Sequence, residues 1–468
     1  MNRTKKNQTS SSFIRRKKEK IHIQVGLDFG TSSTKVVFSQ LGRPLFRALD
    51  FNHNLPQYPN YCIPSVCAVG ENGRILMGAN AARALANKEW NAGLQRLKVV
   101  VAGKHDTRFS DIQTDITFKS YLANHDTKTS PEMLTVKFLA HVMIKSIQAI
   151  KNFPEYKNQD IDFAFNICMP IDHVEHSQVR KVFERIFVLS EMLLNNWLKN
   201  PEKINFSIDS KMIEDSKNRK ADKVFAVPES VASFASYLTS LRRREGLHAL
   251  IDFGAGTTDV SICNLFLSQE DPIHYWYSAR NIPRGTVNVE RRIADHIHTF
   301  DKKKDTCTFQ DIVSCLEDLS NHKDGRHSGY RGDQLNRIIT EELINLRDSR
   351  EYKTTWGNAY GHLKKDYLWR HVEIYTCGGG SYLPEIDKIF SKPWWKNLHV
   401  SYPVRTLPIP DDYDPGTAEA PFERMSVAYG LAIPLPELDK HTLPQSSPNH
   451  TPAPPPVHSL DHEDLYSD

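Results

Sequence analysis

Two short stretches of this chain share one design, and that repetition limits the folds open to it more than any other feature. Residues 26–36 read GLDFGTSSTKV and residues 250–260 read LIDFGAGTTDV. Each is an apolar run, an Asp-Phe-Gly step, a turn of glycine and small residues that carry hydroxyl groups, and a second apolar run. Such a turn between two β-rich runs is typical of a hairpin. The sequence therefore predicts two hairpins with the same turn chemistry.

The order of strand-like and helix-like segments also restarts after residue 248, so the chain reads as an internal duplication. A duplication at so long a period indicates two related units that face each other rather than a solenoid. We predict an α/β body with a first lobe over 21–241, interrupted by an inserted subdomain at about 46–129. The second lobe would cover 242–433, with an inserted helical subdomain at about 286–370.

Local signals place several helices within this body. Ser130-Pro131-Glu132 combines a hydroxyl cap, a proline at the first helical position and an acid near the helix dipole, and so predicts a helix start. The small residues of 230–241 and 426–433 favour helices that pack closely.

Both ends of the chain differ in composition from the body. Residues 1–20 hold eight Lys or Arg and one acid, a net charge of +7, whereas the whole chain is +4. We interpret 1–20 as a disordered arm that could contact nucleic acid or an acidic membrane surface. Eight of the 26 prolines follow residue 433, which predicts a disordered Pro-rich tail over 434–468.

Other compositional signals favour a cytoplasmic protein. No stretch approaches the about 18 apolar residues that span a bilayer, and the charged N-terminus does not fit a signal peptide. No transmembrane segment is therefore expected. Seven cysteines are scattered without a Cys-x-x-Cys pair, which favours reduced thiols and argues against a metal site built on cysteine.

The chemistry of the two turns points to phosphate. Glycine and small residues in a tight turn let backbone N–H groups point into one concavity, where a phosphate chain can sit. Asp28 and Asp252 precede their turns, where a carboxylate can hold a hydrated Mg²⁺ or orient water. Two such turns on facing lobes would hold a triphosphate from both sides.

Five segments together resemble the motifs of a known superfamily. GLDFGTSSTKVVF, LIDFGAGTTDVSI and YTCGGGSYLPEI look like the first phosphate, second phosphate and adenosine motifs of the actin, hexokinase and seventy-kilodalton heat-shock ATPases. AVPESVASFASYL and RMSVAYGLA resemble the two connecting segments of that superfamily. The resemblance covers about residues 21–433. It implies a duplicated ribonuclease-H-like, actin-like ATPase fold with a nucleotide cleft between two lobes.

Within this superfamily the second turn, with Asp252 and Asp259, resembles DnaK-type heat-shock proteins and bacterial actin-like ATPases more than sugar kinases. The resemblance implies an ATP-binding, Mg²⁺-dependent ATPase. Only the Pro-rich tail follows the body, so we expect no substrate-binding domain of its own and a switch that acts through a partner protein. The alternatives are a self-associating, filament-forming actin-like ATPase, a sugar-type kinase and a catalytically inactive scaffold.

The resemblance also assigns roles to individual residues. Asp28 would hold Mg²⁺, Asp252 would orient the metal or water, and Glu229 would orient the attacking water. Lys98 aligns with a phosphate-contacting lysine, although its spacing to the next glycine is one residue longer than in the family, and Lys104 is an alternative. The expected nucleotide contacts are Gly30, Thr31, Ser32, Ser33, Gly254, Gly256, Thr257, Thr258, Asp259, Gly378, Gly379, Gly380 and Ser381.

Two further assignments are open at this point. One is the direction of Lys35, on the strand that leaves the first turn. An adenine-contacting helix is expected within 333–350, where Glu341, Glu342 and Arg347 are candidates, and an ordinary solvated helix face is the alternative.

Overall fold

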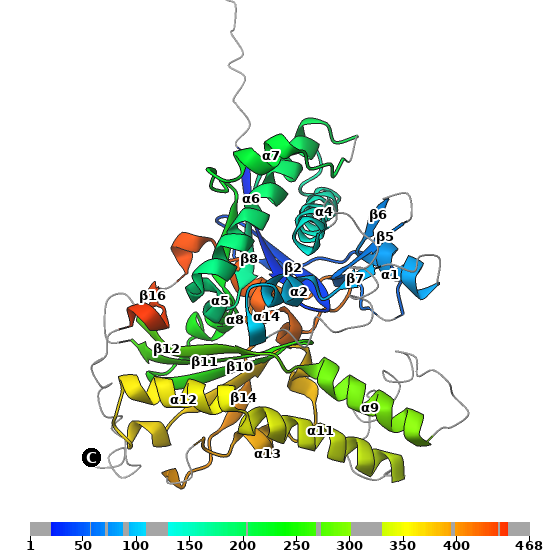
Figure 1. Cartoon of the computed structure of the whole chain (residues 1–468). Helices are drawn as coiled ribbons and strands as arrows, with labels where there is room; N and C mark the ends of the chain where they lie inside the picture. Colours follow the sequence, from blue (N-terminus) through cyan, green and yellow to red (C-terminus); the bar gives the residue numbers. More distant parts are fainter. Residues whose placement is uncertain are drawn as a thin grey trace, which may run out of the picture.

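The computed structural model describes residues 20–447 except 57, 71–73, 88–92, 109–129, 203–204, 268–272, 301–329, 395–397 and 439. The described part is a mixed α/β fold with three sheets (Figure 1). The predicted basic arm up to residue 19 and the end of the predicted tail, 448–468, lie outside the described residues.

The strands are β1 (Ile21–Phe29), β2 (Ser33–Gln40), β3 (Phe46–Ala48), β4 (Cys62–Pro64), β5 (Val66–Val69), β6 (Ile75–Met77), β7 (Gly93–Gln95), β8 (Ile161–Met169), β9 (Val224–Pro228), β10 (Gly246–Phe253), β11 (Thr258–Phe266), β12 (Ile273–Ile282), β13 (Glu373–Cys377), β14 (Val404–Thr406), β15 (Tyr413–Asp414) and β16 (Lys440–Thr442). The helices are α1 (Ala79–Ala86), α2 (Leu97–Gly103), α4 (Pro131–Lys151), α5 (Ile171–Glu175), α6 (Ser177–Lys199), α7 (Ser210–Asp215), α8 (Glu229–Leu238), α9 (Thr286–Phe300), α11 (Tyr330–Asp348), α12 (Arg350–His362), α13 (Ile386–Phe390) and α14 (Phe422–Leu431).

The two large sheets have the same strand order around their hairpins. In the first sheet, β1 pairs antiparallel with β2 and β2 with β3, while β1–β8 and β8–β9 are parallel. In the second sheet, β10–β11 and β11–β12 are antiparallel, while β10–β13 and β13–β14 are parallel. Both hairpins predicted from the sequence are therefore present, each in the interior of its sheet. A third, smaller sheet has the order β6-β5-β7.

The central strands are buried over most of their length because both of their faces are covered. All nine residues of β11 are buried, as are the last five of β1. Strands covered on both faces read as nearly continuous apolar runs rather than as alternating ones. This burial fixes the hairpins firmly and holds the turn at the end of each one in a defined place.

Helix α4 begins as its cap signal predicts. The Ser130 side chain accepts a hydrogen bond from the Met133 N–H, and Pro131 occupies the first turn. In the described ranges, α4 is the one helix long and apolar enough to cross a membrane, and 67% of that apolar window is buried inside the fold. It packs beside α6 in the core of the first sheet, so this packing accounts for its apolar surface.

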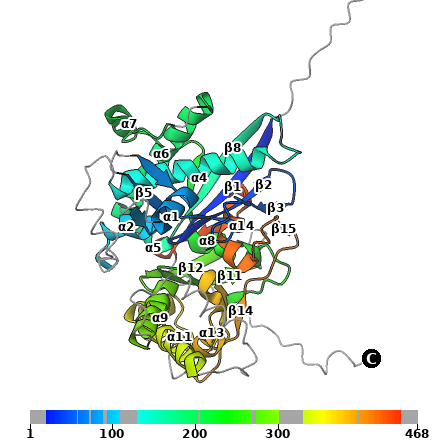
Figure 2. The ribbon, with the colours of Figure 1, turned by 90° about the vertical axis from the view of Figure 1, so that its right-hand side faces the viewer.

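Helices α8 and α14 lie between the two large sheets (Figures 1 and 2). Every residue of α8 is buried. A Cβ on Gly430 of α14 would lie 1.8 Å from the carbonyl oxygen of Ala232 on α8, so the two helices cross with backbones nearly touching. The close packing predicted from the small residues is confirmed.

The two large sheets also contain strands from segments that were predicted to belong to the insertion, to the other lobe or to the tail. Strand β3 at 46–48 belongs to the first sheet, so the insertion begins after it. Strand β15, from the second half of the chain, pairs with β3. Strand β16 pairs with β12, and the Ser447 hydroxyl donates to the Trp276 carbonyl at 2.9 Å. The folded part therefore reaches at least Ser447 and does not end at 433, because the open edge of β12 offers hydrogen bonds to the tail.

Candidate functional site

The two hairpin turns have matching backbone geometry. In the first, the Gly30 N–H donates to the Asp28 carbonyl at 2.9 Å, and in the second the Gly254 N–H donates to the Asp252 carbonyl at 3.2 Å. Beyond these bonds, within the described residues, the backbone N–H groups of Thr31, Ser32, Ala255 and Gly256 have no protein acceptor. Unpaired donors gathered at a tight turn form a site for an anion.

Strand register decides which side chain stands opposite each turn aspartate. Asp28 is paired with Lys35 across β1–β2, and the Lys35 ammonium donates to Asp28 Oδ2 at 2.5 Å. The direction of Lys35 is thereby settled. At the equivalent place in β10–β11, Asp252 is paired with Asp259. Asp259 accepts hydrogen bonds from the Asn281 amide at 2.9 and 3.0 Å.

A second buried ion pair joins two elements that are distant in the sequence. Glu229 is the first residue of α8 and is only 7% exposed, and the Lys98 ammonium at the start of α2 donates to its Oε2 at 2.6 Å. Lys104, the alternative to Lys98, instead pairs with Glu132 at 2.9 Å. The structure therefore brings Lys98 into the site, and Lys104 is engaged elsewhere.

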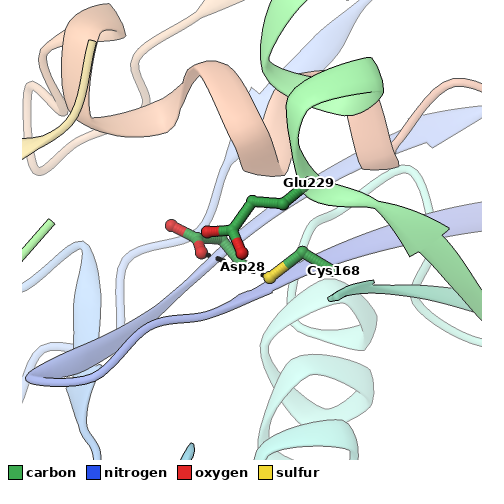
Figure 3. A group of neighbouring side chains, drawn as sticks. All are labelled: Asp28, Cys168 and Glu229. Carbon is green, nitrogen blue, oxygen red and sulfur yellow. Dashed lines mark hydrogen bonds between the residues drawn. The ribbon is translucent and has the colours of Figure 1, made fainter. Parts of the chain in front are cut away.

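Cys168 at the end of β8 lies beside Asp28 and Glu229 (Figure 3). Its Sγ is 3.5 Å from Asp28 Oδ1 and 3.8 Å from Lys98 Nζ. One ligand atom each from Asp28, Cys168 and Glu229 lie within 4.8 Å of one another. Burial raises the pKa of the Cys168 thiol well above its ordinary value, so it is a poor metal ligand beside the carboxylates. The cysteines in the described ranges are all free and buried.

One cavity of about 1110 Å³ is lined by both turns and by the two ion pairs. Helices α9, α11 and α14 and the loop around Tyr58 complete its wall. Of the residues predicted for the site, those on the cavity wall are Asp28, Gly30, Thr31, Ser32, Ser33, Lys98, Glu229, Asp252, Gly254, Thr257, Asp259, Gly378 and Gly379.

Four predicted nucleotide contacts do not line this cavity and have structural roles instead. The Thr258 hydroxyl is fully buried and donates to the Arg284 carbonyl at 2.8 Å. The Ser381 hydroxyl donates to the Gly378 carbonyl at 2.8 Å. Gly380 packs against β10, and Gly256 faces Thr31 of the opposite turn. These four residues lie on the turns named by the sequence, but the sequence gives no direction for their side chains.

The Gly-rich turn after β13 closes against the second hairpin. Gly378 has φ +82°, a left-handed conformation that glycine adopts without strain. A Cβ at this residue would lie 2.2 Å from Asp252 Oδ1. Glycine is therefore required here by both the backbone and the aspartate, which keeps this turn in direct contact with the carboxylate that faces the cavity.

The site has more acidic than basic side chains. Asp28, Glu229, Asp252 and Asp259 are each at most 8% exposed. Burial, together with the charges of Glu229 and Asp28, raises the pKa of Asp252 to about 7. Burial and the charge of Glu229 also raise the pKa of Asp259. The buried lysines Lys35 and Lys98 balance only part of this charge.

The donor set fits a hard divalent cation. Carboxylate oxygens are the ligands that Mg²⁺ prefers, and a cation would relieve the repulsion that raises the pKa of Asp252. The residues that could hold it are Asp28 and Asp252, with Glu229 beside them. The unpaired turn amides would take an anion, so the cavity suits a metal–polyphosphate complex.

The sequence reasoning missed two cations that face the cavity. The position of Lys35 could have been inferred from the sequence, because Lys35 occupies the place in the first hairpin that Asp259 occupies in the second. That of Arg424 on α14 could not, since only the folded chain brings it beside the Gly-rich turn.

The helix expected at 333–350 is present as α11, but it faces the cavity through Asn336 and Ile339. The predicted candidates Glu341 and Glu342 pair instead with Arg292, at 2.7 and 2.9 Å. The solvated-face interpretation therefore fits Glu341, whose side chain is 40% exposed, whereas Glu342 is 12% exposed and held in its ion pair.

No protein-family model matches this chain, and no curated protein matches its sequence.

Proposed function

We propose that this protein binds ATP with Mg²⁺ and hydrolyses it, and that it is a nucleotide-dependent switch that acts through a partner protein. One observation carries the proposal. Two equivalent turns, from two sheets with the same strand order, meet at one cavity together with buried lysine–carboxylate pairs. This supports a duplicated ribonuclease-H-like fold of the actin and heat-shock ATPase type, with one large sheet in each lobe.

Each residue would have a role that follows from its position in the cavity. Asp28 and Asp252 would hold Mg²⁺, which when bound would neutralise charge on the phosphate oxygens. The turn amides at Thr31 and Ala255 would donate to phosphate oxygens from opposite sides. Positioning and electrostatic stabilisation of this kind supply most of the rate in phosphoryl transfer.

Glu229 is placed to orient the attacking water. Its carboxylate is buried, lines the cavity and is held in one orientation by Lys98 at 2.6 Å. The Lys98 ammonium would also favour negative charge on the phosphate that is transferred. Burial alone would lower the pKa of Lys98, but the acidic groups around it, Glu229 among them, hold that pKa above its ordinary value, so this lysine stays charged.

A change between ATP and ADP would be transmitted through α8 and α14. Both helices contact both large sheets, and Glu229 and Arg424 stand in their first turns. A shift of the cavity wall would therefore move helices that contact both sheets.

The experiment measures ATP turnover and sedimentation together for the wild type, Asp252→Asn and the exposed control Asp411→Asn. We expect Asp252→Asn to lower turnover about 100- to 1000-fold while ATP still binds, and Asp411→Asn to match the wild type. Normal turnover in Asp252→Asn, or a wild type that binds no nucleotide, would contradict the proposal. ATP-dependent pelleting would indicate the filament alternative, and a phosphorylated polyol would indicate a kinase.

A further inference from the structure

Arg424 is a cation on the cavity wall that has no counter-ion. It stands in the first turn of α14 and lines the cavity. Its Nε is buried and has no hydrogen-bond partner, and no carboxylate among the described residues forms an ion pair with it. The adjacent carboxylate, Glu423, accepts instead from the Tyr382 hydroxyl at 2.8 Å. Arg424 as a whole is half-buried, but a buried N–H donor without a partner is unfavourable unless a ligand accepts from it.

Two neighbours fix where the guanidinium lies. Its carbon is 5.6 Å from the centre of the Tyr61 ring, a cation–π contact that orients the group. A Cβ on Gly379 would lie 3.6 Å from Arg424 Nε. The guanidinium thus lies beside both an aromatic ring and the Gly-rich turn, and its Nε donor has no protein partner.

Lys35 does not take the same role, although it is nearby. Burial and the charge of Arg424 both act to lower the pKa of Lys35, yet the contact with Asp28 outweighs them and the pKa is raised. The Lys35 charge is therefore already balanced by Asp28. Arg424 is the cation at this end of the cavity that is still available for an anion.

We propose that Arg424 binds the phosphate group next to the sugar of the bound nucleotide. This inference rests on the proposed function, with the sugar placed against the turn of Gly378 and Gly379, as the resemblance of that turn to the adenosine motif implies; Arg424 lies beside the same turn. A guanidinium offers paired N–H donors that match two oxygens of one phosphate. Arg424 therefore determines affinity for every phosphorylated form of the nucleotide and contributes nothing to binding of the nucleoside alone.

The test compares four ligands by isothermal titration calorimetry: adenosine, AMP, ADP and ATP with Mg²⁺. The proteins are the full-length wild type, Arg424→Gln, Arg424→Lys and a control, Arg405→Gln, which removes an exposed arginine on β14. We expect Arg424→Gln to weaken AMP, ADP and ATP about 10- to 100-fold and to leave adenosine unchanged. Arg424→Lys should keep part of the affinity, because it keeps the charge, and Arg405→Gln should match the wild type.

The other possible results would contradict this inference, either alone or together with the proposed function. Equal weakening of adenosine would show that Arg424 only supports the Gly-rich turn, which would overturn the inference. The same affinities in Arg424→Gln as in a wild type that binds nucleotide would also overturn it while leaving the proposed function intact. A wild type that binds none of the four ligands would remove the proposed function and this inference together.

Discussion

The two hairpins have the same backbone but opposite charge balance. In the first, Asp28 faces Lys35 across the strand pair, and the two form an ion pair. In the second, Asp252 faces Asp259, so two acids share the equivalent place. The Asp252 carboxyl has a pKa raised to about 7, first by burial and then by the charges of Glu229 and Asp28.

This difference separates the part of the site that the protein neutralises itself from the part that needs a ligand. The first hairpin carries its own counter-ion, and its geometry is therefore fixed in the free protein. The second hairpin holds buried negative charge that a bound cation would relieve. Two turns with the same types of residue can thus differ: the charge of one is balanced within the protein, and the charge of the other is balanced when a ligand binds.

The largest change in the free energy of unfolding is expected from removing Lys35, the counter-ion in the first hairpin. Lys35→Met leaves Asp28 buried without a partner, and breaking a buried ion pair from one side costs about 3–5 kcal/mol. Urea unfolding at pH 8 should show a loss of that size. The double variant Asp28→Asn with Lys35→Met should recover most of it, because no charge is then left unpaired. If Lys35→Met unfolds at the wild-type urea concentration, the ion pair does not stabilise the first hairpin.

A smaller change in the free energy of unfolding, this time a gain, is expected from removing an acid of the second hairpin. A carboxyl whose pKa is higher in the folded chain than in the unfolded chain takes up a proton on folding between the two pKa values, and it destabilises the fold as the pH rises. The resulting penalty starts near pH 4, where the unfolded carboxyl ionises, and is complete above the folded pKa, which is about 7 for Asp252. Asp259→Asn removes one of the two facing acids and should raise the free energy of unfolding by about 1–2 kcal/mol at pH 8.

The gain should vanish as the pH falls to about 4. Thermal unfolding of the ligand-free protein across this range checks the prediction. A gain that is the same at pH 4 and pH 8 would mean that the charge of Asp259 is not its source.

The smallest effect concerns the contact between the two turns. A Cβ on Gly256 would lie 2.7 Å from Cγ2 of Thr31 in the opposite turn. Gly256→Ala should force the Thr31 side chain aside and weaken ATP binding about 5-fold, a change of about 1 kcal/mol, with little loss of stability. Adding Thr31→Ser removes the methyl group and should restore affinity. Failure of that rescue would show that the two turns do not constrain each other.

Several features of the fold were predictable from residues close together in the sequence. The apolar runs around each Asp-Phe-Gly step predicted both hairpins, and the Ser130 cap predicted the start of α4. Lys35 could have been predicted opposite Asp28 from hairpin register alone, because residues paired across a turn are set by its length. Such features depend on local backbone geometry, turn chemistry and side-chain alternation, all of which a short segment carries by itself.

The tertiary structure alone decided the rest. It brings Lys98 to Glu229 and Arg424 to the Gly-rich turn, and it adds β15 to the first sheet and β16 to the second. It also decides that Thr258 turns away from the cavity and that the pKa of Asp252 is raised. These outcomes depend on which groups are buried together, and burial is a property of the packed chain rather than of any segment within it.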